Sequence, residues 1–351
     1  MRVAQRMISR NYMRTLNNTL SKRAQSLERG DSGLKFNKLS DNVSDGSRAM
    51  HIQEERYQST QQLDNVENLY AEMKSVDSNM ESIHSILQSV QEKVLQAMSE
   101  DYGATSREVI AKQIEKNKEE IIQFANAQFA GKYLFSGTNN STQPFTVNEQ
   151  SGKLQFNGVE VEKIYKDTDG KFYYDDPANT PPKTLVPNSE EIYADIGLGL
   201  KLADGAQVDP RTAFQVSFSG LDILGFGEGI TGKDGTPNVA SNVYDLLTQI
   251  QNAITPNLAK TDADDMHRQL VSLTDKVGMM RTDLGTRMNF LERTKTALEA
   301  DIENMTGLET NLISSDPAEE AMKMKDCEYS WLAVLQLGSK VLPSSLLDFM
   351  N

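Results

Sequence analysis

The sequence predicts an α+β fold, in which the N- and C-terminal segments form a long α-helical coiled-coil bundle and a β-rich domain is inserted between them. Three observations support this prediction. Apolar residues recur every seven positions from Val66 to Ala97, and they do so again from Leu270 to Leu312, which is the spacing of a coiled coil. Residues 132–236 hold six of the ten prolines and several short alternating runs, which is typical of strands and turns.

Composition argues against several classes of function. The 351-residue chain has 50 Asp and Glu against 36 Lys and Arg, a net charge of −14, whereas nucleic acids and anionic membranes both demand a basic surface. One cysteine and three histidines leave few residues for catalysis or metal binding. No part of the sequence approaches the unbroken apolar stretch, about 18–20 residues long, that spans a bilayer. We therefore expect a protein that is not an enzyme, has no cofactor or metal, and binds neither nucleic acid nor membrane.

The first element is a basic amphipathic segment. Residues 1–30 hold seven Arg and Lys residues against Glu28 alone, a local charge of +6, while residues 31–351 sum to −20. A mitochondrial transit peptide has such a composition. A structural helix that packs only after assembly, or an uncleaved export signal, fits it better.

A long helix is expected next, from about Gln61 to Asp101, and a second helix after it. Thr105 and Glu108 have the spacing of a capping box that starts this second helix, which should end near Gly131. The long helix fills the a and d positions of five heptads with apolar residues: Val66, Leu69, Met73, Val76, Met80, Ile83, Leu87, Val90, Val94 and Ala97.

The C-terminal part of the chain mirrors this pattern. The middle d positions of its long helix are polar, so this helix should lie against other helices rather than zip with a copy of itself. Pro317 then starts a last helix. Seven successive a positions of the long helix are apolar: Leu270, Val277, Leu284, Leu291, Leu298, Met305 and Leu312.

Within the β-rich domain, Asp169 and Gly170 predict the turn of a hairpin that joins residues 161–166 to residues 171–174, because glycine tolerates a positive φ. A calcium loop is the weaker interpretation, since Tyr165 stands where such a loop begins with Asp. The glycines from Gly225 to Gly229 are not followed by the lysine of a phosphate-binding loop, and they predict an ordinary loop.

The candidate functional residues lie at the two ends of the chain. Neither terminal helix could stay folded alone in water, so we expect the two to pair and still to leave apolar surface for neighbouring copies. Such an architecture fits a subunit of a tubular polymer. The expected subunit-interface residues are Met13, Leu16, Leu20 and Leu27 in the N-terminal helix, and Trp331, Leu335, Leu342, Leu346 and Leu347 in the C-terminal segment.

Several motifs resemble the bacterial flagellin superfamily. SGLKFNKLSDN at residues 32–42 is similar to its S-G-L-R-I-N-x-A-x-D-D signature, with Asn42 in place of the second Asp. GKYLFSGT at residues 131–138, followed by Pro144 and Phe145, resembles the hook–filament junction branch of the superfamily. Further matches follow in order: SGLDILG at 219–225, VYDLL at 243–247 and SLLDF at 345–349. The resemblance extends over nearly the whole chain.

The resemblance implies a structural adaptor between the hook side and the filament of the bacterial flagellum, extracellular and exported without a cleaved signal peptide. The partners it implies are other copies of the chain, flagellin, the hook-side junction protein, the distal cap protein and an export chaperone. It also implies three domains. These are a terminal helical domain in the inner tube (1–40 and 315–351), a long-helix bundle domain (41–131 and 237–314) and a β-rich outer domain (132–236).

Two other functions stay open at this point. A flagellin, the filament subunit itself, shares the architecture and polymerises alone, although the motif from Tyr133 to Phe135 argues against it. A secreted or intracellular coiled-coil signalling or effector protein, or an enzyme lodged in the β-rich domain, is the more distant alternative.

Overall fold

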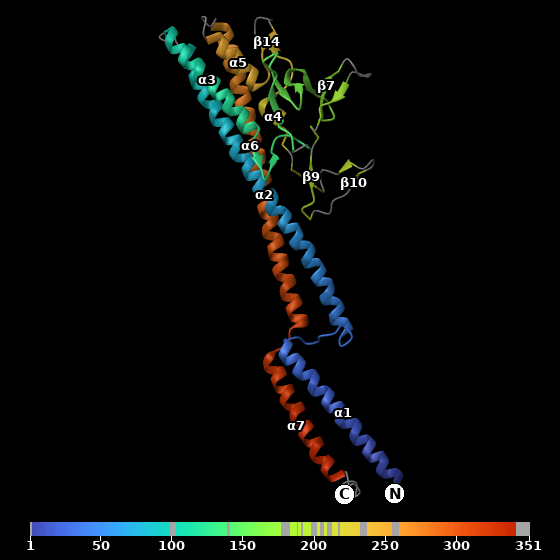
Figure 1. Cartoon of the computed structure of the whole chain (residues 1–351). Helices are drawn as coiled ribbons and strands as arrows, with labels where there is room; N and C mark the ends of the chain where they lie inside the picture. Colours follow the sequence, from blue (N-terminus) through green and yellow to red (C-terminus); the bar gives the residue numbers. More distant parts are fainter. Residues whose placement is uncertain are drawn as a thin grey trace. The chain divides into compact units, whose positions relative to one another are not determined.

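The computed structural model describes residues 2–98, 103–138, 141–176, 183–187, 189–190, 192–197, 202–203, 207–208, 213–216, 218–231, 237–254 and 260–341. The chain divides into two compact units, of which the first comprises Met1–Gln61 and Leu298–Asn351 and the second Gln62–Ala297 (Figure 1). The α+β prediction is confirmed. The helices are α1 (Arg2–Ser32), α2 (Val43–Met98), α3 (Ala104–Ala125), α4 (Gly220–Leu224), α5 (Val243–Ile254), α6 (Lys260–Ile313) and α7 (Pro317–Val341).

The first unit contains α1, α7, the beginning of α2 and the end of α6. Backbone hydrogen bonds join its two connecting segments, since the N–H of Lys35 donates to the carbonyl of Ile313 (2.7 Å) and that of Ser315 to the carbonyl of Gly33 (2.9 Å). Close to this junction, Arg56 on α2 forms an ion pair with Glu309 on α6, with 3.2 Å between Nε and Oε2. The junction thus rests on backbone pairing together with a partly buried charge pair.

The beginning of α2 differs from the prediction, because the helix starts at Val43 rather than near Gln61. Its first turn is capped by Asn42, whose side-chain oxygen accepts a hydrogen bond from the N–H of Asp45 at 3.2 Å. Asparagine is among the best residues at a helix N-cap. The substitution of Asn for the second Asp of the signature therefore leaves the cap intact.

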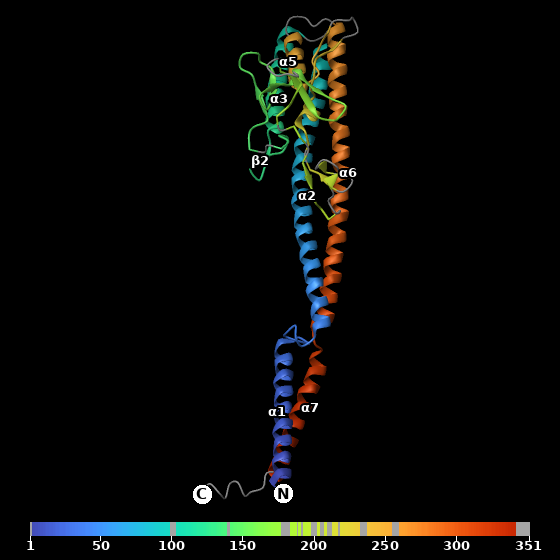
Figure 2. The same cartoon turned by 90° about the vertical axis from the view of Figure 1, so that its right-hand side faces the viewer.

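The core of the second unit lies between α2 and α6, which run side by side in both Figure 1 and Figure 2. Nine of the ten heptad positions predicted on α2 are buried, and only Leu69 is partly exposed. A charge pair crosses the rim of this seam between Arg281 and Asp77, with 3.2 Å between Nε and Oδ1. The a positions of α6 in this unit are buried as predicted: Leu270, Val277, Leu284 and Leu291.

The second helix of the sequence prediction is α3, and it packs against α5. Its expected capping box is wrong. The N-cap is Gly103, whose backbone is extended, and no side chain caps the helix. Thr105 lies too late in the chain, because a capping side chain must come from the non-helical residue that precedes the first turn. On its inward face, Ile110, Ile114 and Ile121 are buried.

Short antiparallel strands fill the segment between α3 and α5. Among the described residues of this segment, two sheets have three strands, in the orders β3-β4-β5 and β6-β7-β8, and four are pairs, β1-β2, β9-β12, β10-β11 and β13-β14. A 3₁₀ turn, Val161–Lys163, separates β5 from β6. The strands are β1 (Gln128–Phe129), β2 (Lys132–Tyr133), β3 (Phe145–Val147), β4 (Leu154–Phe156), β5 (Val159–Glu160), β6 (Ile164–Lys166), β7 (Phe172–Asp175), β8 (Lys183–Leu185), β9 (Tyr193–Ala194), β10 (Leu202–Ala203), β11 (Gln207–Val208), β12 (Phe214–Gln215), β13 (Ile230–Thr231) and β14 (Pro237–Val239).

The predicted hairpin is present as β6 and β7, which pair from Ile164 opposite Tyr174 to Lys166 opposite Phe172. Gly170 supplies the left-handed turn residue, with φ of +80°.

Arg287, a polar d position on α6, and Phe290 hold the β segment onto the bundle. The guanidinium of Arg287 donates to the side chain of Gln215 on β12 at 3.2 Å and lies 5.0 Å from the ring centre of Phe218. One turn further on, Phe290 stacks on Phe214 with 6.1 Å between ring centres. The polar d position at Arg287 is therefore a contact for the inserted strands.

Gly225, which ends α4, offers a test of this packing. Its φ of 82° and ψ of 160° belong to a region that is essentially restricted to glycine, and a Cβ there would overlap the carbonyl oxygen of Ser241. We expect Gly225→Ala to cost about 2–4 kcal/mol of unfolding free energy in thermal melts, from backbone strain and overlap together.

Gly170→Ala is the matched control for Gly225→Ala. Its φ is also positive, at +80°, but a Cβ there meets nothing within 4 Å. The control should therefore cost only about 1–2 kcal/mol, which is the strain of a left-handed backbone alone. Equal losses in the two variants would contradict the overlap at Gly225.

Candidate assembly surface

The terminal helices α1 and α7 pack against each other along their length, and they lie side by side in Figures 1 and 2. The two run antiparallel, because Gly33 at the end of α1 bonds to Ser315 next to the start of α7, while Tyr12 lies against Gly338 near the other end of α7. The predicted pairing of the terminal helices is thus confirmed.

The less exposed positions of each helix alternate by three and four residues, as in a coiled-coil seam. Few of them are aliphatic. On α1 they are Ser9, Tyr12, Leu16, Thr19, Arg23, Ser26 and Arg29, and on α7 they are Glu320, Met324, Cys327, Trp331, Val334 and Gly338.

Specific contacts replace aliphatic packing along this seam. The guanidinium of Arg23 lies 4.5 Å from the ring centre of Trp331, a cation–π arrangement. Gly338 is buried beneath Tyr12, and a Cβ there would overlap the tyrosine ring. A side chain larger than hydrogen at residue 338 would therefore have to displace the ring of Tyr12.

Glu320, a charged residue in the first turn of α7, is buried, with 5% of its surface exposed. Lys323 on the next turn binds it with 3.1 Å between Nζ and Oε1, and it also binds Glu319 at 3.0 Å. Hydrogen bonds to Glu319 and then Glu320 raise the pKa of Lys323 above its ordinary value. This cluster keeps the buried carboxylate next to a charged ammonium group.

The structure separates the predicted interface residues into three groups. Leu16 and Trp331 lie on the seam between α1 and α7. Leu342, Leu346 and Leu347 lie outside the described residues. The remaining four point away from the seam and are exposed: Met13 by 52%, Leu20 by 41%, Leu27 by 48% and Leu335 by 40%.

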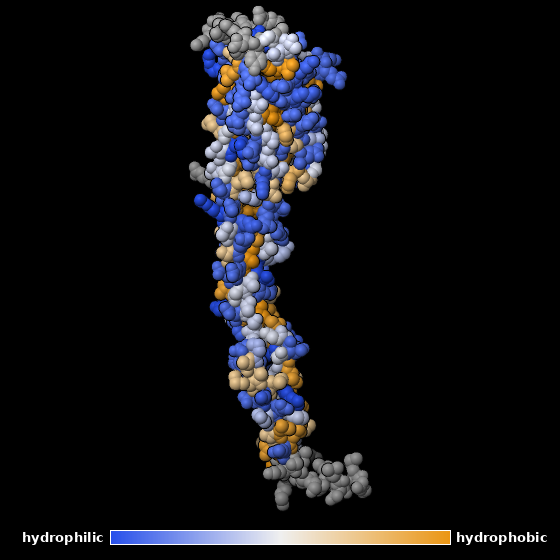
Figure 3. Space-filling model, turned by 90° about the vertical axis from the view of Figure 1, so that its left-hand side faces the viewer, coloured by the Kyte–Doolittle hydropathy of each residue, from blue (hydrophilic) through white to orange (hydrophobic). Residues whose placement is uncertain are grey.

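The exposed residues form what we call the apolar flank of the pair. On α1, Met13, Leu20 and Leu27 follow each other at seven-residue intervals, each one position after a seam residue. On α7, Leu332 and Leu335 are exposed and also lie one position after a seam residue, whereas the exposed Leu337 lies one position before Gly338 and is not part of the flank. Figure 3 shows apolar residues reaching the surface in the part of the molecule formed by α1 and α7. Exposed apolar side chains in such a row are typical of a surface that another protein covers.

Sequence reasoning missed the seam residues that are not aliphatic, namely Tyr12, Ser26, Glu320 and Gly338. Hydrophobicity gives no signal for them. Their three–four spacing is regular, but it becomes visible only once the facing helix is known.

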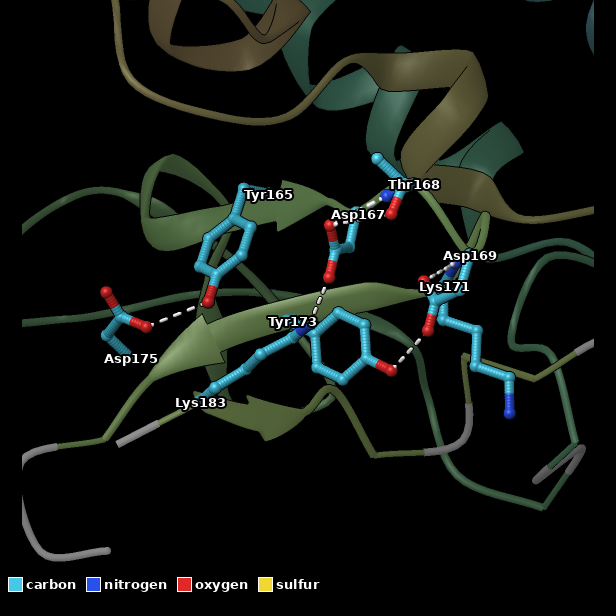
Figure 4. A network of polar contacts seen from close by, with 8 residues as sticks. All are labelled: Tyr165, Asp167, Thr168, Asp169, Lys171, Tyr173, Asp175 and Lys183. Atoms are coloured by element: carbon cyan, nitrogen blue, oxygen red, sulfur yellow. Dashed lines mark hydrogen bonds and ion pairs between the residues drawn. The ribbon is translucent and has the colours of Figure 1, made fainter. Parts of the chain in front are cut away.

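A second polar cluster lies on the sheet β6-β7-β8 (Figure 4). It occupies the stretch for which a calcium loop was the weaker interpretation. Asp167 accepts a hydrogen bond from the ammonium group of Lys183, and Asp169 accepts one from the hydroxyl of Tyr173 at 2.6 Å. These carboxylates are bound to side chains of the same sheet. In the part of the chain that the structure describes, no group of three His, Cys, Asp or Glu side chains is arranged as metal ligands.

The cluster predicts a pH dependence. The bond from Lys183 lowers the pKa of Asp167 below its ordinary value, and the bond from Tyr173 lowers that of Asp169. A carboxyl with a lowered folded-state pKa stabilises the fold above its unfolded pKa of about 3.9, and this contribution is lost as the pH falls through the lower folded value. We expect the NMR signals of Tyr173 and Gly170 to shift only below about pH 4. Asp169→Asn should remove the shift at Tyr173, and an unchanged titration in that variant would contradict the assignment.

A polar cleft of about 600 Å³ lies between the turn that precedes β4, the 227–229 loop and α5. Asp245 and Asn242 line it together with the ion pair of Lys153 and Glu162. Burial raises the pKa of Asp245 above its ordinary value, while its carboxylate accepts a hydrogen bond from the Asn242 amide at 2.7 Å. Lys153 and Glu162 thus pair with each other, and Asp245 is held by a neutral amide.

None of the described helices is long and apolar enough to traverse a bilayer.

Comparisons with known proteins agree with the sequence motifs. Residues 3–140 match the family model of the bacterial flagellin N-terminal helical region. The fold is similar to a solved structure described as a flagellar hook-associated protein from Vibrio parahaemolyticus, with a TM-score of 0.56 and 17% identity over 78% of this chain and 100% of that chain. No curated protein matches the chain.

Two further solved structures are similar with lower scores. Flagellar hook associated protein-3 from Legionella pneumophila has a TM-score of 0.48 and 14% identity over 74% of this chain and 97% of that chain. FlgL from Bacillus cereus has a TM-score of 0.46 and 15% identity over 75% of this chain and 99% of that chain.

Proposed function

We propose that this chain, whose residues 3–140 match the bacterial flagellin N-terminal family, is a structural subunit of the flagellum that joins the hook side to the filament. The proposal places it with FlgL, also called hook-associated protein 3, and assigns it no enzymatic activity. The observation that carries the proposal is the antiparallel pair of α1 and α7 with its exposed apolar flank.

The physical argument starts from how little this pair buries. Its seam is built largely from polar and small residues, while Met13, Leu20, Leu27 and Leu335 stay in contact with water. Burying one such side chain contributes about 1.5–3 kcal/mol, and a two-helix pair has no further layer of its own to cover them. Neighbouring copies in a tubular wall supply that layer. The function of the chain is then to pack against other copies of itself. The β segment takes no part in this packing, so its sequence is free to vary.

The finer assignments follow from this proposal. Residues 1–40 and 315–351 form the inner tube, residues 41–131 and 237–314 the long-helix bundle, and residues 132–236 the outer domain. The partners are further copies of the chain, flagellin and the hook-side junction protein. The distal cap protein and an export chaperone act during assembly, and the subunit is exported without cleavage of a signal peptide.

Electron microscopy of purified protein with isolated hooks that carry the hook-side junction protein tests the proposal. A junction subunit should add a short zone to the hook ends and stop there, and flagellin should then extend it. A flagellin would instead grow long filaments by itself, and a signalling protein would leave the hook ends bare. Either of these last two outcomes would end the proposal.

A further inference from the structure

The apolar flank contains one side chain that a small oxidant can change. Met13 is 52% exposed, whereas Leu20 and Leu27, which follow it on α1, carry no reactive atom. An exposed thioether is readily oxidised to the sulfoxide, which turns a flexible apolar side chain into a polar one. Met73 and Met80 in the seam of α2 are at most 1% exposed, so they are shielded from the same chemistry.

The surroundings of Met13 on its own helix are positive. Arg10 precedes it by three residues and Arg14 follows it directly, and residues three apart are neighbours on a helix surface. Both arginines are exposed, and among the described residues no ion pair reaches either of them. The first acidic residue of α1 is Glu28, about four turns away.

The stretch of α7 beside Met13 adds no negative charge. Tyr12 lies against Gly338 and Arg23 against Trp331, so this stretch runs from about residue 329 to residue 341. It contains no Asp or Glu. A positive surface raises the local concentration of anions, and salt weakens the attraction. Anionic oxidants should therefore reach Met13 more often than neutral ones.

Met279 on α6 has different surroundings and is more exposed. Its exposed fraction is 73%, and Asp275 and Asp283 lie four residues before and after it, on the same side of the helix. Lys276 is partly buried and lies over the ring of Phe226, with 5.3 Å between Nζ and the ring centre. Exposure alone would make Met279 the faster of the two methionines to be oxidised.

We propose that Met13 is a modification site at which an anionic peroxide oxidises the thioether, and that the sulfoxide prevents a second copy from covering the flank. The second half of the inference rests on the proposed function. A lone pair on Sδ attacks the terminal peroxide oxygen, the O–O bond breaks, and the other oxygen leaves with the peroxide proton. Sulfur loses two electrons and the peroxide gains them. The new S–O dipole must lose its water when a neighbour covers the flank, which weakens association.

Two oxidants of different charge test the first half on the full-length monomer. Peroxymonosulfate is an anion and hydrogen peroxide is neutral, and mass spectrometry of peptides gives the ratio of the oxidation rate of Met13 to that of Met279. With hydrogen peroxide, Met279 should react at least as fast as Met13. With peroxymonosulfate in about 0.02 M salt the ratio should rise about threefold, and about 0.5 M salt should remove most of the rise.

Arg10→Gln with Arg14→Gln should abolish this rise, because it removes the charges next to Met13 and keeps a good helix former. Lys22→Gln with Lys325→Gln is the control. It removes the same charge at exposed positions, of which residue 22 is about 13 Å along α1 from Met13, and it should leave most of the rise. A ratio that does not depend on the charge of the oxidant would show that another part of the chain neutralises the arginines. That result, or a rise that persists in the arginine variant, would overturn the site.

Assembly of the oxidised protein tests the second half. Oxidation should lower the association constant of the wild type in sedimentation at least about tenfold, while circular dichroism shows that its helices persist. Met13→Leu keeps an apolar side chain without the sulfur and should assemble after the same treatment. Met7→Leu is the matched control. Met7 is 67% exposed and is also three residues from Arg10, but it lies about 120° around α1 from Met13, so its replacement should give no protection.

Two outcomes would contradict the second half. They are an oxidised wild type that assembles like the untreated protein, and a Met13→Leu variant that loses assembly on oxidation as the wild type does. If the untreated wild type does not add to hooks, the proposed function fails instead. The ratio of oxidation rates and the sedimentation of the copies alone then still decide for or against the modification site.

Discussion

Replacing Leu284 by aspartate is expected to unfold the second unit at moderate temperature. Leu284 is fully buried at an a position of α6, opposite the apolar seam of α2. Removing a buried leucine costs about 2–5 kcal/mol even when alanine replaces it, and an unpaired carboxylate in the same space adds a desolvation penalty. Since domains are stable by only about 5–15 kcal/mol, we expect a loss of most of the stability.

Met279→Asp is the matched control for this experiment. It places the same charge five residues away on the same helix, but Met279 is 73% exposed, so a change of about 0.5 kcal/mol or less is expected. Thermal unfolding followed by circular dichroism compares the two variants, with Leu284→Ala as an intermediate. A Leu284→Asp variant that melts with the wild type would mean that α6 does not pack through this face.

The heptads of α2 and the a positions of α6 could be predicted because apolar side chains occupy all of them. Val66, Met80 and Leu87 on α2 are buried as their spacing requires, and so are Leu270 and Val277 on α6. In a long two-helix seam, the positions that are apolar in the sequence are also the positions that contact the other helix. Helix ends were harder, because the start of α2 depends on a hydrogen bond that the N–H of Asp45 donates to the side chain of Asn42, and not on a pattern.

The terminal pair could be predicted as a pair but not in its register. Met13, Leu20 and Leu27, which are expected at the subunit interface, form the aliphatic series on α1, yet the seam with α7 runs through Tyr12, Thr19 and Ser26, one position earlier. A hydrophobicity pattern assumes that the apolar face is turned inward within one chain. In a subunit whose apolar face is covered by its neighbours, that assumption places the seam on the wrong side of the helix.

The β segment illustrates a further limit. Asp169 and Gly170 identified one hairpin from local turn chemistry, whereas the order of the sheets depends on contacts between distant strands. The attachment of β12 to Arg287 and Phe290 had no sequence signal, since a polar d position on α6 is equally compatible with exposure to water.

Replacing Met13 and Leu20 together by glutamine is expected to abolish assembly while leaving the monomer folded. Both side chains are largely exposed on the apolar flank, so the monomer loses little packing, and glutamine is a good helix former. In the assembly each copy would lose about 1.5–3 kcal/mol per buried side chain. Over two positions this lowers the association constant by at least about a hundredfold. Addition to hook ends, counted by electron microscopy, measures the effect.

The value of this variant is that it separates assembly from folding. Leu16→Gln changes a seam residue between α1 and α7, so it should reduce helicity and assembly together, whereas the flank variant should reduce assembly alone. Met279→Gln, exposed on α6, controls for the loss of an apolar side chain elsewhere. If the flank variant assembles at the wild-type yield, the exposed row on α1 is not an interface, and the α1–α7 pair must contact its neighbours through its polar side.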